Sequence, residues 1–177
     1  VNDGSRDESL LKLLEWYHKY PNYFRILDFN SNFGHHNALW AGFEHVRGDI
    51  VITMDADLQN PPEELPKLLE KIDEGYDYVG SYRLGKRQDA KWRDWASKLN
   101  NKFREKITDI RMSDQGCMLR AYKRSVVDAI IACGDYTAFI PALAFKFASK
   151  YTEIGMRHAP RFKGETKYGL YYLLRTH

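Results

Sequence analysis

The stretch 51–62 (Val-Ile-Thr-Met-Asp-Ala-Asp-Leu-Gln-Asn-Pro-Pro) constrains the fold of this chain more than any other. Residues 50–54 are a short, apolar, β-branched run, which predicts a buried strand. Pro61 and Pro62, followed by two glutamates, indicate the start of a helix, because proline suits the first helical turn and acids favour the positive end of the helix dipole. The residues between this strand and this helix should therefore lie at the carboxyl edge of an α/β sheet, where such sheets bind ligands.

Two aspartates, Asp55 and Asp57, stand at that predicted edge. Side chains two residues apart point to the same side if strand geometry continues. Two carboxylates with open positions beside them suit Mg²⁺ or Mn²⁺, which would keep waters and share a substrate diphosphate. The same short Asp-x-Asp pattern also occurs in surface turns with two solvated acids. The rest of the sequence has to decide between a metal site and a turn.

Strand and helix patterns alternate along the first half of the chain. Helical periodicity predicts helices, and apolar runs predict strands, in the order 5–20 (helix), 24–29 (strand), 37–46 (helix), 50–54 (strand), 63–74 (helix) and 76–82 (strand). This alternation predicts an α/β fold with a doubly wound, mostly parallel sheet flanked by helices. Two apolar helices, over residues 126–131 and 138–148, are expected in the core.

The composition excludes several classes of protein. The chain has 177 residues, about one domain, and its net charge of +3 is too small to indicate nucleic-acid binding. Cys117 and Cys133 show neither metal-ligand spacing nor a disulfide framework, so a reducing compartment is expected. No run approaches the roughly 18 apolar residues of a membrane span. The chain begins with valine and not methionine, and we expect a piece of a longer protein.

A stripe of large apolar side chains recurs at helical spacing over residues 91–107. It consists of Trp92, Trp95, Leu99 and Phe103, and the opposite face is rich in lysine and arginine. One interpretation is a helix that lies in a membrane interface, because tryptophan favours the headgroup level and basic residues favour anionic lipid. The other is an ordinary surface helix that packs on the sheet. This feature by itself does not separate the two.

Five motifs occur in an order that resembles a known family. They are Val1-Asn2-Asp3-Gly4-Ser5, Asn32-Phe33-Gly34 with Ala41-Gly42-Phe43, Asp55-Ala56-Asp57-Leu58-Gln59-Asn60-Pro61-Pro62-Glu63, Gly116-Cys117-Met118-Leu119-Arg120-Ala121-Tyr122 and Gly164-Glu165-Thr166-Lys167-Tyr168. In this order they resemble the family 2 glycosyltransferases of GT-A fold, and within them the polyprenyl-phosphate branch. The resemblance implies a Rossmann-like nucleotide-binding domain and moves the interpretation of the two aspartates to a metal–nucleotide site.

The resemblance also implies a role for each matching position. It places Asp3, Asp55, Asp57 and Arg83 at the nucleotide-sugar, and Asp55, Asp57 and Gln59 at a Mg²⁺ or Mn²⁺ ion. It places Asp114 near the transferred sugar and the acceptor, with Arg120 on the same loop–strand unit, as candidate catalytic residues. It associates the basic tail loop with the acceptor phosphate, through Arg161, Lys163 and Lys167.

The chain departs from the family pattern at both ends. The family's first strand and its loop are absent, as are the carboxyl-terminal membrane helices of the polyprenyl branch. We therefore expect residues 1–177 to be a single glycosyltransferase domain, truncated at both ends, of a protein at the cytoplasmic face of the cell membrane. The expected partners are a nucleotide-diphosphate sugar, a polyprenyl phosphate and the membrane surface, with a homo-oligomer possible and no nucleic acid.

The expected reaction is inverting transfer of a sugar from a nucleotide-diphosphate sugar, most simply a UDP-sugar, to the polyprenyl phosphate. A phosphate acceptor is largely ionised at pH 7 and needs little help from a base, so Asp114 would orient rather than deprotonate. A family 2 enzyme that acts on a polysaccharide or protein hydroxyl stays open, and there Asp114 would be a true base. A nucleotidyltransferase is disfavoured because no lysine-bearing glycine-rich loop is present. A non-catalytic nucleotide-sugar-binding domain is a third alternative.

Overall fold

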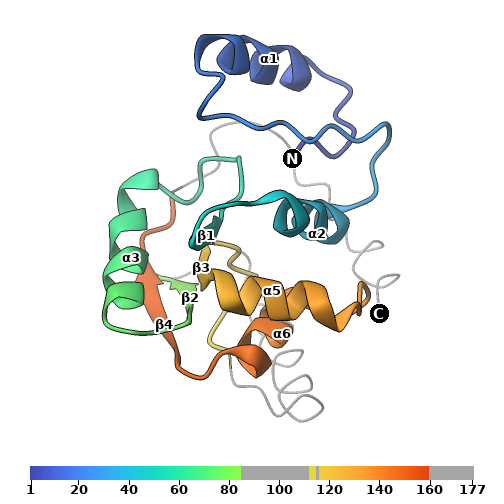
Figure 1. The fold of residues 1–177 in the computed structure, drawn as a ribbon. Helices are drawn as coiled ribbons and strands as arrows, with labels where there is room; N and C mark the ends of the chain where they lie inside the picture. Colours follow the sequence, from blue (N-terminus) through green and yellow to red (C-terminus); the bar gives the residue numbers. More distant parts are fainter. Residues whose placement is uncertain (85–111, 115, 160–177) are drawn as a thin grey trace, which may run out of the picture.

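The computed structural model describes residues 1–84, 112–114 and 116–159. The helices are α1 (Ser9–Lys19), α2 (His35–His45), the short 3-10 helix η1 (Pro62–Glu64), α3 (Leu65–Asp73), α5 (Arg124–Cys133) and α6 (Ile140–Phe147). The strands are β1 (Ile50–Thr53), β2 (Tyr78–Arg83), β3 (Arg120–Lys123) and β4 (Tyr151–Met156). Figure 1 shows α2, α5 and α6 gathered on one side of the sheet and α3 on the other, while α1 stands apart from both layers.

The four strands form one mixed sheet in the order β1-β3-β2-β4. β2 pairs in parallel with β4, and β3 runs antiparallel to both of its neighbours, β1 and β2. Helix–strand alternation predicted the α/β class and a mostly parallel sheet, and three of the four strands do share a direction. β3 is reversed because the chain leaves β2 and enters β3 at the same edge of the sheet, and such a connection makes neighbouring strands antiparallel.

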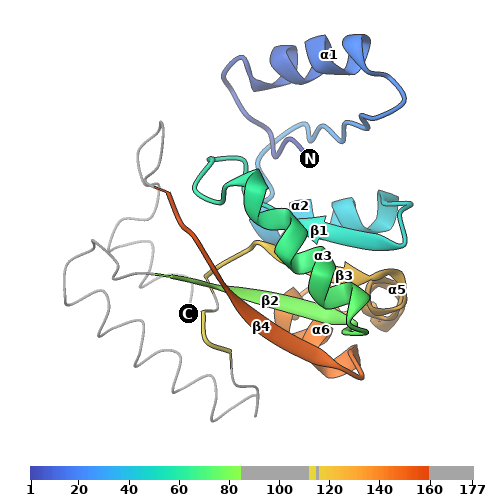
Figure 2. The ribbon, with the colours of Figure 1, turned by 90° about the vertical axis from the view of Figure 1, so that its left-hand side faces the viewer.

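Consecutive residues of the central strands supply two separate cores, one on each face. Tyr78 and Tyr122 face α2, α5 and α6, where Trp40, Phe43, Val126, Val127 and Ile130 are also buried. Val79 and Ala121 face α3, whose Leu68 and Ile72 are buried against them. This alternation is the period of two that a strand imposes on its side chains. Figure 2 looks onto one face of the sheet, with α3 in front of the strands.

The amino-terminal segment is less well covered than the sheet. None of the residues of α1 is buried. The strand predicted over residues 24–29 is reduced to one parallel bridge, between Asn2 and Asp28, in which Asn2 N donates to Leu27 O (2.8 Å) and Phe29 N donates to Asn2 O (2.9 Å). That prediction was wrong in extent, because among the described residues only Asn2 offers this segment backbone groups to pair with. A cavity of about 680 Å³ separates residues 21–25 from β1.

Two groups of predicted residues lie outside the described part of the chain. They are the stripe Trp92, Trp95, Leu99 and Phe103 and the basic tail residues Arg161, Lys163 and Lys167. Within the described residues, no helix is both long enough and apolar enough to cross a membrane.

Candidate functional site

The loop that carries Asp55 and Asp57 leaves β1 and turns sharply into η1. Gln59 N donates to Asp57 Oδ1 (3.1 Å), a local bond that closes the turn. Leu58 has φ of 60°, and it is the single non-glycine residue with positive φ in the part of the chain that the structure describes. A leucine in this region is strained, and such strain concentrates at functional loops. Asp55, Asp57 and Gln59 are all half-buried.

The donor atoms of this loop fit a hard divalent cation. Asp55, Asp57 and Gln59 offer two carboxylates and one amide oxygen, the ligand types that Mg²⁺ and Mn²⁺ accept. Among the described residues, no group of three or more histidine, cysteine, aspartate or glutamate side chains could hold a metal. A cation here would therefore need water or substrate oxygens as further ligands, as Mg²⁺ usually does.

Asp114 forms a bidentate ion pair with Arg83, which stands at the end of β2. Arg83 Nε donates to Asp114 Oδ2 (2.6 Å) and Arg83 Nη2 donates to Asp114 Oδ1 (2.9 Å). Burial by itself would raise the pKa of Asp114, but the hydrogen bonds and the charge of Arg83 outweigh it and lower that pKa. Asp114 is thus a firmly ionised carboxylate in a fixed orientation.

Gly116 leaves the space that this ion pair needs. Its N–H donates to Asp114 Oδ1 (3.0 Å). A Cβ at position 116 would lie 3.2 Å from Arg83 Nη2 and 3.5 Å from Asp114 Oδ1. A larger residue would therefore push against the guanidinium that orients Asp114.

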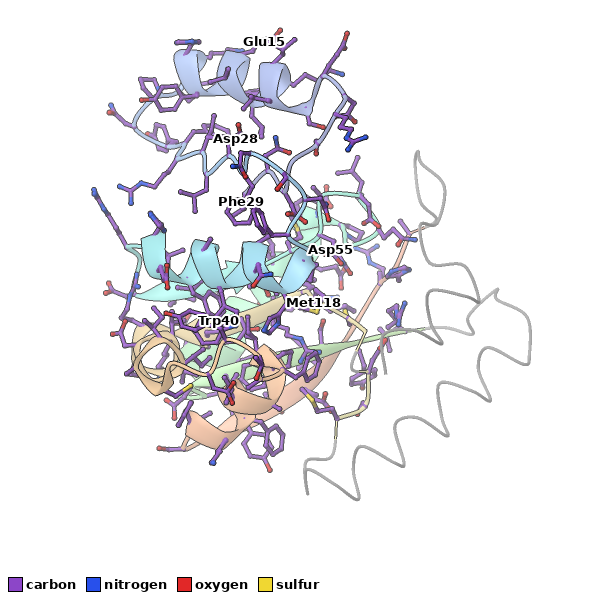
Figure 3. The ribbon with its side chains drawn as sticks, turned by 90° about the vertical axis from the view of Figure 1, so that its right-hand side faces the viewer. Glu15, Asp28, Phe29, Trp40, Asp55 and Met118 are labelled. Atoms are coloured by element: carbon purple, nitrogen blue, oxygen red, sulfur yellow. The ribbon has the colours of Figure 1, made fainter. Side chains whose placement is uncertain are left out.

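The antiparallel pairing of β1 with β3 brings the two acidic loops to one edge of the sheet. Thr53, the last residue of β1, is paired with Arg120, the first residue of β3. Thr53 Oγ1 donates to Met118 O (2.7 Å). Figure 3 shows Asp55 and Met118 close together at this edge. Thr53 and Met118 lie 65 residues apart in the sequence, so their contact brings two distant loops to one place.

Asp3 is engaged in holding the loop before α2. Its carboxylate accepts hydrogen bonds from Asn32 Nδ2 (2.9 Å), Phe33 N (2.7 Å) and Gly34 N (3.0 Å). Resemblance to the family predicts a contact between Asp3 and the base or ribose, and that contact stays a prediction. In the structure, Asp3 also has a structural role, because it joins the first loop of the chain to the start of α2.

Arg120 lies inside the protein. It has no exposed surface, and its guanidinium donates to Cys117 O (2.8 Å), Asp114 O (3.2 Å) and the hydroxyl of Tyr78. Arg120 was predicted as a catalytic residue together with Asp114. That role stays a prediction, and its buried position puts it behind the loop that carries Asp114.

The chain that leaves β4 is tied to the loop after Asp57. Ala159 N donates to Gln59 O (2.8 Å). The buried carboxylate of Glu64 accepts from Arg157 Nε (2.7 Å) and Lys67 Nζ (2.6 Å), and these two bonds lower the pKa of Glu64 to about 2. Arg157 and Ala159 therefore lie beside the segment that follows Asp57.

Glu153 was not among the residues predicted from the sequence. It lies on β4, a strand that the sequence patterns did not reveal, and it accepts from Ser113 N (2.9 Å) and Ser113 Oγ (2.7 Å). The run Tyr-Thr-Glu-Ile-Gly-Met was the available signal, since it is rich in residues that favour strands. No local pattern could have indicated its contact with residue 113.

Comparison with known proteins identifies the family. Residues 1–131 match Glycosyl transferase family 2. The chain belongs to this family. The resemblance noted from the five motifs is thereby confirmed, and three quarters of the chain carries the match.

The chain is also similar to named transferases from several bacteria. It is 49% identical over 168 residues to the undecaprenyl-phosphate 4-deoxy-4-formamido-L-arabinose transferase of Pseudomonas savastanoi pv. phaseolicola, covering 95% of this chain and 50% of that protein. It is 49% identical over 175 residues to the protein of the same name from Shewanella sediminis, covering 98% of this chain and 52% of that protein. The chain thus spans about half the length of these relatives.

Solved structures confirm the GT-A type of α/β fold. Glucosyl-3-phosphoglycerate synthase from Mycobacterium tuberculosis superposes with a TM-score of 0.55 at 19% identity, covering 91% of this chain and 60% of that one. The same enzyme in complex with Mn²⁺, uridine diphosphate and glucosyl-3-phosphoglycerate gives a TM-score of 0.55 at 17% identity, covering 93% and 60%. At these identities the likeness concerns the fold.

Proposed function

We propose that this chain is the nucleotide-sugar-binding and catalytic part of a glycosyltransferase. The reaction would move a sugar from a nucleotide-diphosphate sugar, most simply a UDP-sugar, to a polyprenyl phosphate such as undecaprenyl phosphate, with inversion at the anomeric carbon. Two lines of evidence support the acceptor class: membership of family 2 and 49% identity to transferases named for an undecaprenyl-phosphate substrate. The inverted product follows from a single in-line displacement.

The observation that carries this proposal is the meeting of two acidic loops at one edge of the sheet. One loop offers Asp55 and Asp57, and the other presents Asp114 in a fixed ion pair with Arg83. The carboxyl ends of β1 and β2 and the start of β3 share this edge, which is where α/β sheets bind ligands. The arrangement supports a donor held by the first loop and a sugar or acceptor held beside the second.

Asp55, Asp57 and Gln59 would hold a Mg²⁺ or Mn²⁺ ion at the donor diphosphate. When bound, such an ion stabilises the negative charge that accumulates on the departing diphosphate. The fold neighbours crystallised with Mn²⁺ and uridine diphosphate make Mn²⁺ and UDP the first ligands to test. Asp3, at the first loop, would contribute to the nucleotide pocket from the neighbouring strand end.

The state of Asp114 favours a phosphate acceptor over a hydroxyl acceptor. A carboxylate that is bidentate with Arg83 and has a lowered pKa is a weak base, so it would remove a proton from a hydroxyl poorly. A phosphate acceptor is already largely ionised at pH 7 and needs no such base. Asp114 would then orient the sugar or the acceptor.

Membrane attachment and phosphate binding complete the proposal. The stripe Trp92, Trp95, Leu99 and Phe103 would lie at the headgroup level at the cytoplasmic face of the membrane, and Arg161, Lys163 and Lys167 would bind the acceptor phosphate. The bond from Ala159 N to Gln59 O, just before these basic residues in the sequence, supports an acceptor phosphate near the donor.

Calorimetric titration of UDP, with and without Mn²⁺, tests the donor site in this chain. We expect Asp57→Asn to weaken Mn²⁺-dependent binding at least about tenfold, because the site offers few anionic ligands. Asp73→Asn is the matched control, since Asp73 is an exposed acid at the end of α3. Equal metal dependence in wild type and Asp57→Asn would remove Asp57 from the site.

A second experiment tests the reaction in the full-length protein. Transfer of radiolabelled sugar from a UDP-sugar to undecaprenyl phosphate is compared with transfer to a soluble hydroxyl acceptor. We expect product with the lipid phosphate and none with the hydroxyl. Product with the hydroxyl alone would assign Asp114 as a base, and donor binding without transfer to either acceptor would indicate a binding domain.

A further inference from the structure

Side chains of the sheet hold the chain around Asp114. Glu153, in the middle of β4, receives three hydrogen bonds from Ser113. Ser113 N donates to Oε1 (3.2 Å) and Oε2 (2.9 Å), and Ser113 Oγ donates to Oε2 (2.7 Å). The residue immediately before Asp114 is therefore held by Glu153, which lies 40 residues further along the chain.

Arg120 holds the other side of the same loop. From its buried position it donates to the carbonyl oxygens of Asp114 and Cys117, so it holds the chain at two points around Asp114. Cys117 in turn is buried, with its Sγ 3.0 Å from Ser81 Oγ. Backbone carbonyls bound to a guanidinium are charge-assisted contacts and are stronger than neutral ones.

Gly80 has no side chain, and it therefore leaves room for Glu153 and Arg120 beside it. It is paired with Glu153 across the parallel strands β2 and β4. A Cβ at Gly80 would lie 3.2 Å from Glu153 Cγ and 3.5 Å from Arg120 Nη1. A side chain at this position would displace the carboxylate, the guanidinium or both.

We propose that Glu153 and Arg120 are positioning residues for Asp114, acting across Gly80 to fix the loop 112–117 at the angle that the transfer reaction needs. This inference rests on the proposed function. Glu153 orients Ser113, Arg120 orients the carbonyls of Asp114 and Cys117, and Arg83 can then meet the carboxylate with both nitrogens. Neither positioning residue touches the substrate.

Catalysis depends steeply on such placement. A displacement of about 1 Å of an orienting group can lower a rate by up to about 100-fold without removing any contact to substrate. The donor site, in contrast, lies on the loop after β1 and does not receive its geometry from Glu153. Loss of Glu153 should therefore lower kcat and leave the KM for the nucleotide-sugar almost unchanged.

Kinetics of the full-length protein with a UDP-sugar and undecaprenyl phosphate test the proposal. We expect Glu153→Ala to lower kcat at least about tenfold, and Glu153→Gln to recover part of the loss because its amide oxygen still accepts from Ser113. The matched control is Asp77→Asn. Asp77 stands at the opposite end of β2 and makes the same kinds of contact, to Lys123 Nζ (2.9 Å) and Lys150 N (3.0 Å), far from the acidic loops. This control should keep its kcat.

A measurement that needs no turnover separates this inference from the proposed function. Carbon-13 NMR of the Asp114 carboxyl group reports its pKa in this chain. When Glu153→Ala loosens the loop, the ion pair with Arg83 weakens and the pKa of Asp114 rises towards its ordinary value, whereas Asp77→Asn leaves it low.

The outcomes are distinguishable. A raised Asp114 pKa and a lowered kcat together support the positioning role. An unchanged pKa and unchanged kcat in Glu153→Ala overturn it, as does an equal kcat loss in Asp77→Asn. If the wild-type protein transfers no sugar to any acceptor, the proposed function fails, and the NMR result still decides whether Glu153 and its neighbours fix the loop.

Discussion

The loop 112–117 and the amino-terminal segment 1–29 are built in opposite ways. The described residues of this loop have no regular structure, yet side chains from three strands hold them in place: Arg83 from β2, Arg120 from β3 and Glu153 from β4. The segment 1–29 contains an eleven-residue helix, yet that helix buries none of its residues, and the bridge between Asn2 and Asp28 joins two parts of the segment itself. Regular structure and firm attachment are thus separate properties in this protein.

The difference teaches where stability resides. Helical hydrogen bonds by themselves make an isolated helix of this length marginal in water, and tertiary burial supplies most of the stability of a helix in a protein. A loop whose polar groups are satisfied by buried partners is fixed even without internal hydrogen bonds. The candidate catalytic carboxylate stands on the firmly attached element, which is what a site that must hold its geometry requires.

The largest expected contrast comes from removing one aromatic side chain from the core beneath the sheet and one from the amino-terminal segment. Phe43, on α2, is 2% exposed, and Trp16, on α1, is 50% exposed. Phe43→Ala should lower the free energy of unfolding by about 3–5 kcal/mol, because it leaves a cavity in the core. Trp16→Ala should change it by less than about 0.5 kcal/mol, as is usual on the surface. Urea denaturation measures both, and equal losses would show that α1 is part of the core.

The second prediction concerns the cavity between residues 21–25 and β1. Asn2 already forms one rung of a parallel ladder with Asp28, and Val1 lines the cavity. Five residues that alternate between apolar and polar, fused before Val1, should extend that ladder along Leu27 and Arg25. They should raise the free energy of unfolding by about 2 kcal/mol. The same fusion with proline at the pairing positions is the control. Equal stability of the two fusions would mean that no strand fits there.

The third prediction uses pH to break a second buried attachment, that of Glu64 on η1. The pKa of Glu64 is lowered to about 2 by Lys67 and Arg157, so its pairing stabilises the fold fully above the ordinary value of 4.5 and is lost as pH falls towards 2. As the pH is lowered between these values, the midpoint temperature of thermal unfolding should fall more steeply in wild type than in Glu64→Gln. Glu63→Gln, at the exposed neighbouring position, should behave as wild type. Parallel curves for all three would exclude the pair as a source of acid sensitivity.

The smallest expected effect concerns the strained turn at Leu58. Its side chain is 56% exposed and its φ is 60°. Leu58→Gly should stabilise the protein by about 0.5 kcal/mol, because relief of the left-handed strain slightly exceeds the entropy that glycine loses on folding. Leu58→Ala keeps the Cβ and should show no gain. A loss of stability in the glycine variant would mean that the leucine side chain has a partner that its exposure does not suggest.

Much of the α/β framework was predictable because it rests on local patterns. The run 50–54, the prolines after it and the apolar face of 65–72 determine β1, η1 and α3 within a residue or two, since periodicity and helix-start signals act over a few residues. The aspartates Asp55 and Asp57 follow β1, so their place at the edge of the sheet could also be inferred. The motif around Gly116 indicated a loop leading into a strand, and β3 begins there.

Only the tertiary structure decided how the second acidic loop is held. The reversal of β3, the burial of Arg120 and the contact of Glu153 with Ser113 join residues that lie far apart in the sequence. Such contacts depend on which strands become neighbours, and strand order is set by the burial of whole faces, which no short pattern encodes. The sequence by itself therefore determined which residues carry the chemistry and at which edge the first of them stand. The packing of β2, β3 and β4 decided the orientation of Asp114, because Arg83 of β2 holds its carboxylate, while Arg120 of β3 and Glu153 of β4 hold the backbone beside it.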